Sequence, residues 1–145
     1  MNEEIKQEWV RRLRSGEYAQ GQRYLRINDK YCCLGVLCDM ATEAGVVNGA
    51  PGSPLVNTVC YVNVNDPWDF NSQMLPYAVT DWAGIESVNA KNPGVSISPE
   101  LKPDNDLGLH PEKMPEFYPA HTSLAQLNDL GYSFSQIADV IEEQL

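Results

Sequence analysis

The sequence has no long apolar run. Its 145 residues contain no stretch near the roughly 20 apolar residues that a membrane-spanning helix requires. The first residues, MNEEIKQEWVRRLRSGEY, are charged throughout and do not resemble a secretory signal. We therefore expect a cytoplasmic protein that does not enter a membrane.

Basic residues are few and unevenly placed. Ten Lys and Arg stand against twenty Asp and Glu, which gives a net charge of −10. Residues 31–145 alone hold three basic and fifteen acidic residues. A protein binds along a duplex by neutralising its phosphates, and this acidic bulk would repel them. We expect no direct binding to duplex nucleic acid.

Cysteine is scarce, and the four thiols are Cys32, Cys33, Cys38 and Cys60. In a reducing compartment we expect them to be free and structural. Their spacing lacks the close pair of thiolates that converges on zinc, and GEYAQGQ lacks the lysine of a phosphate-binding loop. We expect neither a metal nor a cofactor.

Helical periodicity dominates both ends of the chain. Apolar residues recur at helical spacing from about residue 2 to 14, with Asn2 as the N-cap. Residues 123–145 carry two apolar stripes separated by Gly131, which predicts a C-terminal helical hairpin. A third helix is expected at about 32–44, where three of the cysteines recur among apolar residues.

The remaining elements are expected to be short. Residues 22–32, with turn formers at Asn28 and Asp29, predict a hairpin, and 58–64 predicts a β-branched strand. Pro67 and Trp68 are expected to close that strand.

A short helix is expected after Leu75, in the segment LPYAVTDWAGI. Pro76 suits its first turn and Gly84 its end. The spacing turns Tyr77, Val79 and Trp82 inward or nearly so.

These elements predict a single compact α+β domain over residues 1–145, in which three to four helices pack on a small antiparallel sheet built from 22–32 and 58–64. Six prolines at about 86–120 predict a long excursion over the surface. The expected core residues are Trp9, Leu34, Leu37, Val79, Trp82, Leu127, Phe134, Ile137 and Ile141.

One candidate binding site stands out, in the segment LRSGEYAQGQRYLR. Guanidinium forks bind phosphate, aromatic faces stack on bases and amides read base edges, so the composition suits a small nucleotide-like ligand. The simpler interpretation is a helix end and a hairpin with solvated arginines. The candidate ligand-binding residues are Arg14, Tyr18, Gln20, Arg23, Tyr24 and Arg26.

A thiol nucleophile is the alternative site. Cys32 or Cys33 would lie at a helix N-terminus, where the helix dipole lowers a thiol pKa. The base would be His110 or His121, with Asn128, Asp129 or Asp39 to orient the imidazole. No nucleophile signature surrounds these cysteines, so we expect no catalytic residues and keep a cysteine-dependent hydrolase or transferase as the alternative.

Four blocks of the sequence resemble a known family when taken in order. LRSGEYAQGQ, YCCLGVLCDM, LPYAVTDWAGI and SLAQLNDLGYSFSQIADVIEEQL are similar to small uncharacterised proteins of tailed bacteriophages and prophages. The resemblance implies a phage accessory protein made in the cytoplasm of the bacterial host, and it transfers no catalytic residues. By analogy of context, we expect a non-enzymatic protein that binds a host factor or a small phosphorylated ligand, with counter-defence as one such role.

Overall fold

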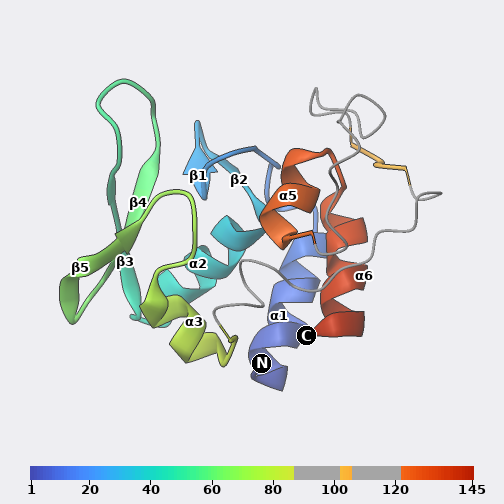
Figure 1. The fold of residues 1–145 in the computed structure, drawn as a ribbon, viewed down its shortest axis with the longest axis horizontal. Coiled ribbons are helices and arrows are strands. Elements are labelled where there is room, and N and C mark those ends of the chain that lie inside the picture. Colours follow the sequence, from blue (N-terminus) through green and yellow to red (C-terminus); the bar gives the residue numbers. More distant parts are fainter. Residues whose placement is uncertain (87–101, 106–121) are drawn as a thin grey trace.

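The computed structural model describes residues 1–86, 102–105 and 122–145 (Figure 1). Most of the predicted excursion at 86–120, and both histidines, lie outside the described residues. The described chain is α+β, with helices at both ends and two small antiparallel sheets. The predicted fold class is therefore confirmed.

The first and last helices lie side by side (Figure 1). Helix α1 (Glu3–Arg14) begins where the side chain of Asn2 accepts a hydrogen bond from the Ile5 N–H at 3.1 Å. It packs against α6 (Phe134–Gln144), which follows α5 (Leu124–Asp129). The predicted terminal hairpin and its contact with the first helix are both confirmed.

Two capping boxes fix the hairpin helices. The Ser123 side chain accepts from the Gln126 N–H, while the Gln126 side chain accepts from the Ser123 N–H. Ser133 and Gln136 repeat the arrangement at the start of α6. Each box satisfies two backbone donors that a helix start leaves without partners.

Helix α2 (Cys33–Glu43) is the buried centre of the fold. Its polar side is narrow and consists of Asp39, Thr42 and Glu43, and Gly45 beyond its end takes a left-handed φ of 75°. The loop before it crosses so closely that the Leu25 carbonyl lies against Gly35, where a side chain would not fit. The indole N–H of Trp9 in α1 donates to the Cys33 carbonyl at 3.0 Å.

Helix α3 (Tyr77–Ala83) begins after Pro76 and ends at Gly84, as predicted. Its first two N–H groups, from Tyr77 and Ala78, donate to the Asp69 carboxylate at 2.9 Å each. The expected orientation is wrong for Tyr77, which is 64% exposed, because this bond network fixes the helix with its first residue facing outward.

The sheet differs from the expected one. Strands β1 (Arg26–Ile27) and β2 (Lys30–Tyr31) form the predicted hairpin, with Asn28 and Asp29 both at positive φ in its turn. A separate sheet has the order β3-β4-β5, from β3 (Val47–Pro51), β4 (Val59–Asn63) and β5 (Asp66–Asn71). An isolated bridge between Ile27 and Thr58 connects the two sheets.

Two of these strands were not predicted. Gly, Pro and Asp are depleted in strands, and β3 reads VNGAP while β5 reads DPWDFN. Both are outer strands, where proline is tolerated because no ladder bond is lost on the open side. Strand β4 ends at Asn63, and the expectation that Pro67 and Trp68 close it is wrong, because both belong to the next strand, β5.

The expected core residues are buried, except Trp82, which is half-buried against the core. Tyr61 of β4 also enters the core and is 2% exposed. No helix in the described ranges combines the length and apolarity that a bilayer crossing demands.

Because Tyr61 faces the core, its neighbours Cys60 and Val62 point to the other side of the sheet. Ala50 pairs with Cys60, and Phe70 pairs with Val62. We call this surface the outer sheet face, and we define it by Ala50, Cys60, Val62 and Phe70 together with the exposed Trp68, which precedes Phe70 in the stretch where the register of β4 and β5 shifts. Trp68 is 86% exposed and Phe70 is 52% exposed.

The substitution Gly35→Ala should destabilise the protein strongly. The new methyl group would overlap the Leu25 carbonyl, and backbone on both sides would have to move. Overpacking of this kind costs about 3 kcal/mol or more of the free energy of unfolding, which thermal unfolding would show as a melting temperature lower by about 10 °C.

The matched control is Gly49→Ala, where the new methyl group would lie 3.1 Å from a single side-chain atom of Val59 that can move. We expect a small change there. Equal melting temperatures for both variants would show that the loop does not press on α2.

Candidate functional site

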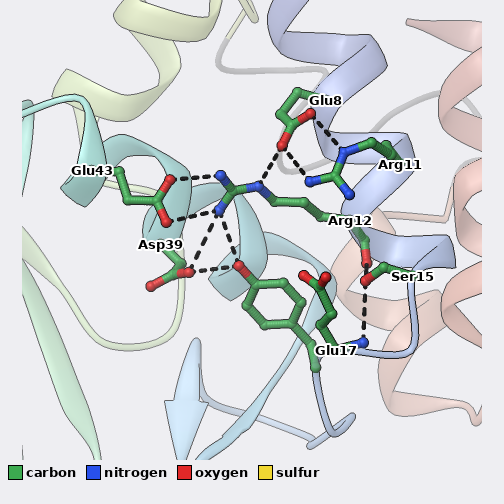
Figure 2. A network of polar contacts seen from close by, with 8 residues as sticks. Glu8, Arg11, Arg12, Ser15, Glu17, Asp39 and Glu43 are labelled. Atoms are coloured by element: carbon green, nitrogen blue, oxygen red, sulfur yellow. Dashed lines mark hydrogen bonds and ion pairs between the residues drawn. The ribbon is translucent and has the colours of Figure 1, made fainter.

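Arg12 is the centre of a half-buried polar network between α1, α2 and the segment that follows α1 (Figure 2). Its guanidinium contacts the Glu43 carboxylate at 2.6 Å and the Glu8 carboxylate at 2.8 Å. The same group donates to the Tyr18 hydroxyl at 3.1 Å, and that hydroxyl donates to Asp39 at 2.6 Å. Every nitrogen of the Arg12 guanidinium is thus hydrogen-bonded.

The network shifts the acidity of its members. Hydrogen bonds from Arg11 and then Arg12 lower the pKa of Glu8 to about 2. Burial, followed by the hydrogen bond to Asp39, raises the pKa of Tyr18 to about 12. At neutral pH the carboxylates outnumber the guanidinium groups, so the network does not attract an anion.

Two of the three candidate arginines, Arg14 and Arg26, are also engaged by carboxylates. Arg14 contacts Asp139 at 2.5 Å and Glu142 at 2.9 Å, across the α1–α6 interface. Arg26 contacts Asp29 at 2.8 Å and lies 5.0 Å from the centre of the Tyr31 ring. A phosphate at either position would have to displace a carboxylate.

An open depression of about 430 Å³ lies at the α1–α6 interface and includes Arg14 in its lining. Arg11 and Glu142 also line it. Each arginine is already paired, Arg11 with Glu8 and Arg14 with the carboxylates of α6. The depression therefore has no unpaired guanidinium to offer an anion.

Gln20 is a structural residue that holds its loop to the hairpin. Its side-chain N–H groups donate to the Asn128 side chain at 2.9 Å and to the Tyr132 carbonyl at 2.8 Å. Its carbonyl oxygen accepts from the Asn105 amide. Asn128 is fully buried, donates to the Gly21 carbonyl at 2.6 Å and accepts from the Cys33 N–H at 3.2 Å.

Arg23 and Tyr24 continue this loop. The backbone N–H of Arg23 donates to the Asp129 carboxylate at 2.9 Å, with Arg23 at a left-handed φ of 70° and its side chain exposed. Tyr24 is half-buried. Tyr18 reaches Tyr31 edge-on, with ring centres 5.0 Å apart, and so connects indirectly with Arg26. The six candidate residues are therefore spread over three places and not gathered in one.

Cys32 and Cys33 lie at the start of a helix, as predicted, but their pKa values are raised and not lowered. Cys32 caps α2 and Cys33 begins it, and both are buried. Burial raises the pKa of Cys32 to about 12 and that of Cys33 well above its usual range, so the expected lowering by the helix dipole is wrong. The Cys33 thiol donates to the Leu124 carbonyl at 3.5 Å. The four thiols are free.

The residues proposed to assist a thiol nucleophile are hydrogen-bonded to other parts of the chain. Asn128 and Asp129 hold the 20–23 loop, and Asp39 holds Tyr18. His110 and His121 lie outside the described residues. Within the described ranges, no three His, Cys, Asp or Glu side chains are grouped as a metal site would require.

Asn128 is the residue whose role the sequence did not reveal. A signal was present, because an asparagine beside Leu127 in an apolar stripe must find partners when it is buried. Its partners lie about a hundred positions earlier in the chain, which no local pattern indicates.

The whole chain, residues 1–145, matches the model of one family, described as a domain of unknown function, DUF8296. The chain belongs to this family. No curated protein and no solved structure matches it.

Two tyrosine hydroxyls of this DUF8296 domain offer a matched test of its polar network. The Tyr61 hydroxyl is buried without a hydrogen-bond partner among the described residues, whereas the Tyr18 hydroxyl has two. Removing an unsatisfied buried hydroxyl is neutral or stabilising, so Tyr61→Phe should raise the free energy of unfolding by up to about 1 kcal/mol, while Tyr18→Phe should lower it by about 1–2 kcal/mol. Denaturant unfolding measures both, and a loss for Tyr61→Phe equal to that for Tyr18→Phe would contradict the assignment.

The thiols should react in the order of their exposure. Cys60 is half-buried, whereas Cys32, Cys33 and Cys38 are buried with raised pKa values. Mass spectrometry after labelling with a disulfide reagent should show Cys60 modified first, and the other three only on unfolding. Fast native labelling of Cys32 or Cys33, with a pH midpoint below ~8.5, would instead favour the thiol enzyme.

Proposed function

We propose that the protein is a non-enzymatic binding protein of a bacteriophage or prophage, which acts in the bacterial cytoplasm on a positively charged host protein. Counter-defence, in the sense of blocking a host factor, is the role we assign to that binding. The observation that carries the proposal is the separation of charge along the chain. No Lys or Arg occurs between Lys30 and Lys91.

That stretch contains α2, the three-stranded sheet and α3, so one half of the fold carries carboxylates alone. Its exposed acidic residues include Asp66, Asp81 and Glu86. A surface of one sign attracts a partner of the other sign over long range and speeds association. A basic protein is the partner that this surface suits.

The other half of the fold argues against a small phosphorylated ligand. Arg11, Arg12, Arg14 and Arg26 are each paired with carboxylates. Enzymatic use of the cysteines is also disfavoured, because the two thiols at the start of α2 are buried and protonated at neutral pH.

The test begins with affinity capture from bacterial lysate at low and high salt, followed by binding measurements with each purified candidate. Asp66→Asn, Asp81→Asn and Glu86→Gln together should slow association with a genuine partner by about tenfold at low salt. Asparagine at position 66 keeps an oxygen to accept the hydrogen bond from the Trp68 N–H.

The matched control removes three carboxylates elsewhere, by Glu4→Gln, Glu17→Gln and Glu143→Gln. It changes the net charge equally, so an equal slowing would show that only the total charge matters. A nucleotide that raises the melting temperature of the wild type would contradict the proposal, because a ligand that binds the folded state must stabilise it.

A further inference from the structure

We infer that the outer sheet face is the docking surface of this protein for an apolar segment flanked by Lys and Arg in a protein partner. The inference rests on the proposed function and adds where the partner binds and by what chemistry. It starts from the two aromatic side chains of β5. Trp68 and Phe70 are two of the most exposed large apolar residues in the described part of the chain.

Phe70 lies beside apolar residues of β4, and the exposed Trp68 stands two residues before it. Phe70 lies opposite Val62 in the register of β4 and β5, and Cys60 lies two residues before Val62 on the same side. Directly opposite side chains of neighbouring strands contact each other. A large exposed apolar patch marks an interaction site, and tryptophan is the residue most often found at its energetic centre.

The face is held rigid before any partner arrives. Asp69, between Trp68 and Phe70, points the other way and accepts hydrogen bonds from the first two N–H groups of α3. It also accepts from the Asn63 amide of β4 at 3.2 Å. Tyr61 anchors β4 in the core from behind. Since β5 is already ordered, binding through it loses little conformational entropy.

The charges around the face select the partner. The three strands carry no Lys or Arg and only two charged residues, Asp66 and Asp69. Asp69 is occupied by α3, so the exposed Asp66, which accepts from the Trp68 N–H, remains to contact a partner. Lys or Arg beside an apolar segment would complement this carboxylate, and a guanidinium can also stack on the exposed Trp68 ring.

A second copy of the chain fits this face less well. Two copies meeting here would bring like-charged carboxylates together. The outer strands each contain a proline, Pro51 in β3 and Pro67 in β5, and a residue without an N–H weakens pairing between sheet edges. We therefore assign the face to a basic partner.

The first experiment uses two synthetic amphipathic peptides with the same Leu and Phe positions, one with Lys and one with Glu at the polar positions. Trp68 is the built-in reporter, because Trp9 is buried and Trp82 is half-buried. The Lys peptide should shift the tryptophan emission to the blue and protect it from acrylamide quenching. Protection by neither peptide, or by both equally, would overturn the inference.

The second experiment measures the affinity of the Lys peptide, and of any captured basic protein, by calorimetry. Trp68→Ala and Phe70→Ala should each weaken binding about tenfold or more. The control is Leu55→Ser, which removes a 92% exposed apolar side chain from the loop between β3 and β4. It should change the affinity less than about twofold, since we place that loop outside the contact. Thermal unfolding checks that each variant is folded.

The outcomes separate the two proposals. If a basic partner binds and the Trp68 and Phe70 variants bind it equally well, the docking surface is wrong and the proposed function stands. If the Lys peptide binds through Trp68 but no basic protein is captured, the proposed function fails and the surface chemistry stands. A dimer in sedimentation that Trp68→Ala abolishes would identify a second copy as the occupant and overturn the inference.

Discussion

Burial of α2 on nearly every side is the constraint on which the rest of this structure depends. A helix that is apolar everywhere except on one narrow side must be enclosed, and here α1, α3, α5, β2 and β3 all contact it. The enclosure is tight enough that the Leu25 carbonyl rests against Gly35 and accepts from the Cys32 N–H at 3.2 Å. The loop at residues 20–25 is thereby fixed over the start of α2, and Asn128 holds it there from α5.

This enclosure also decides which residues remain available for function. The thiols at the start of α2 are placed where a helix dipole could activate them, yet the same packing that places them removes water, and the loss of solvation is the larger effect. The side-chain amides of Gln20 and Asn128 bind each other and fix the 20–25 loop. Arg12 and Arg14 of α1 form ion pairs with α2 and α6. The three-stranded sheet contacts α2 through β3, so its opposite face remains available for binding.

The elements found from sequence are those that local chemistry determines. Asn2, Ser123 and Ser133 cap helices within three residues, and each helix has its own apolar period, so these signals are readable one segment at a time. Strands β3 and β5 lack such a signal, because their proline, glycine and aspartate are tolerated only by virtue of their outer position in the sheet.

The carboxylate partners of the candidate arginines could not be found from the sequence for a related reason. Arg14 and Glu142 are 128 positions apart, and only the packing of the first helix on the last brings them together.

That packing determines when the molecule can fold. The apolar stripe of α1, with Trp9, Val10 and Leu13, is synthesised well before α6, which packs on it. At the usual speed of a ribosome the stripe waits on the order of ten seconds for its cover. Contacts between such distant parts of a chain also form slowly, because a long loop must close first. The apolar stripe of α1 therefore stays uncovered until α6 has been synthesised and this long loop has closed.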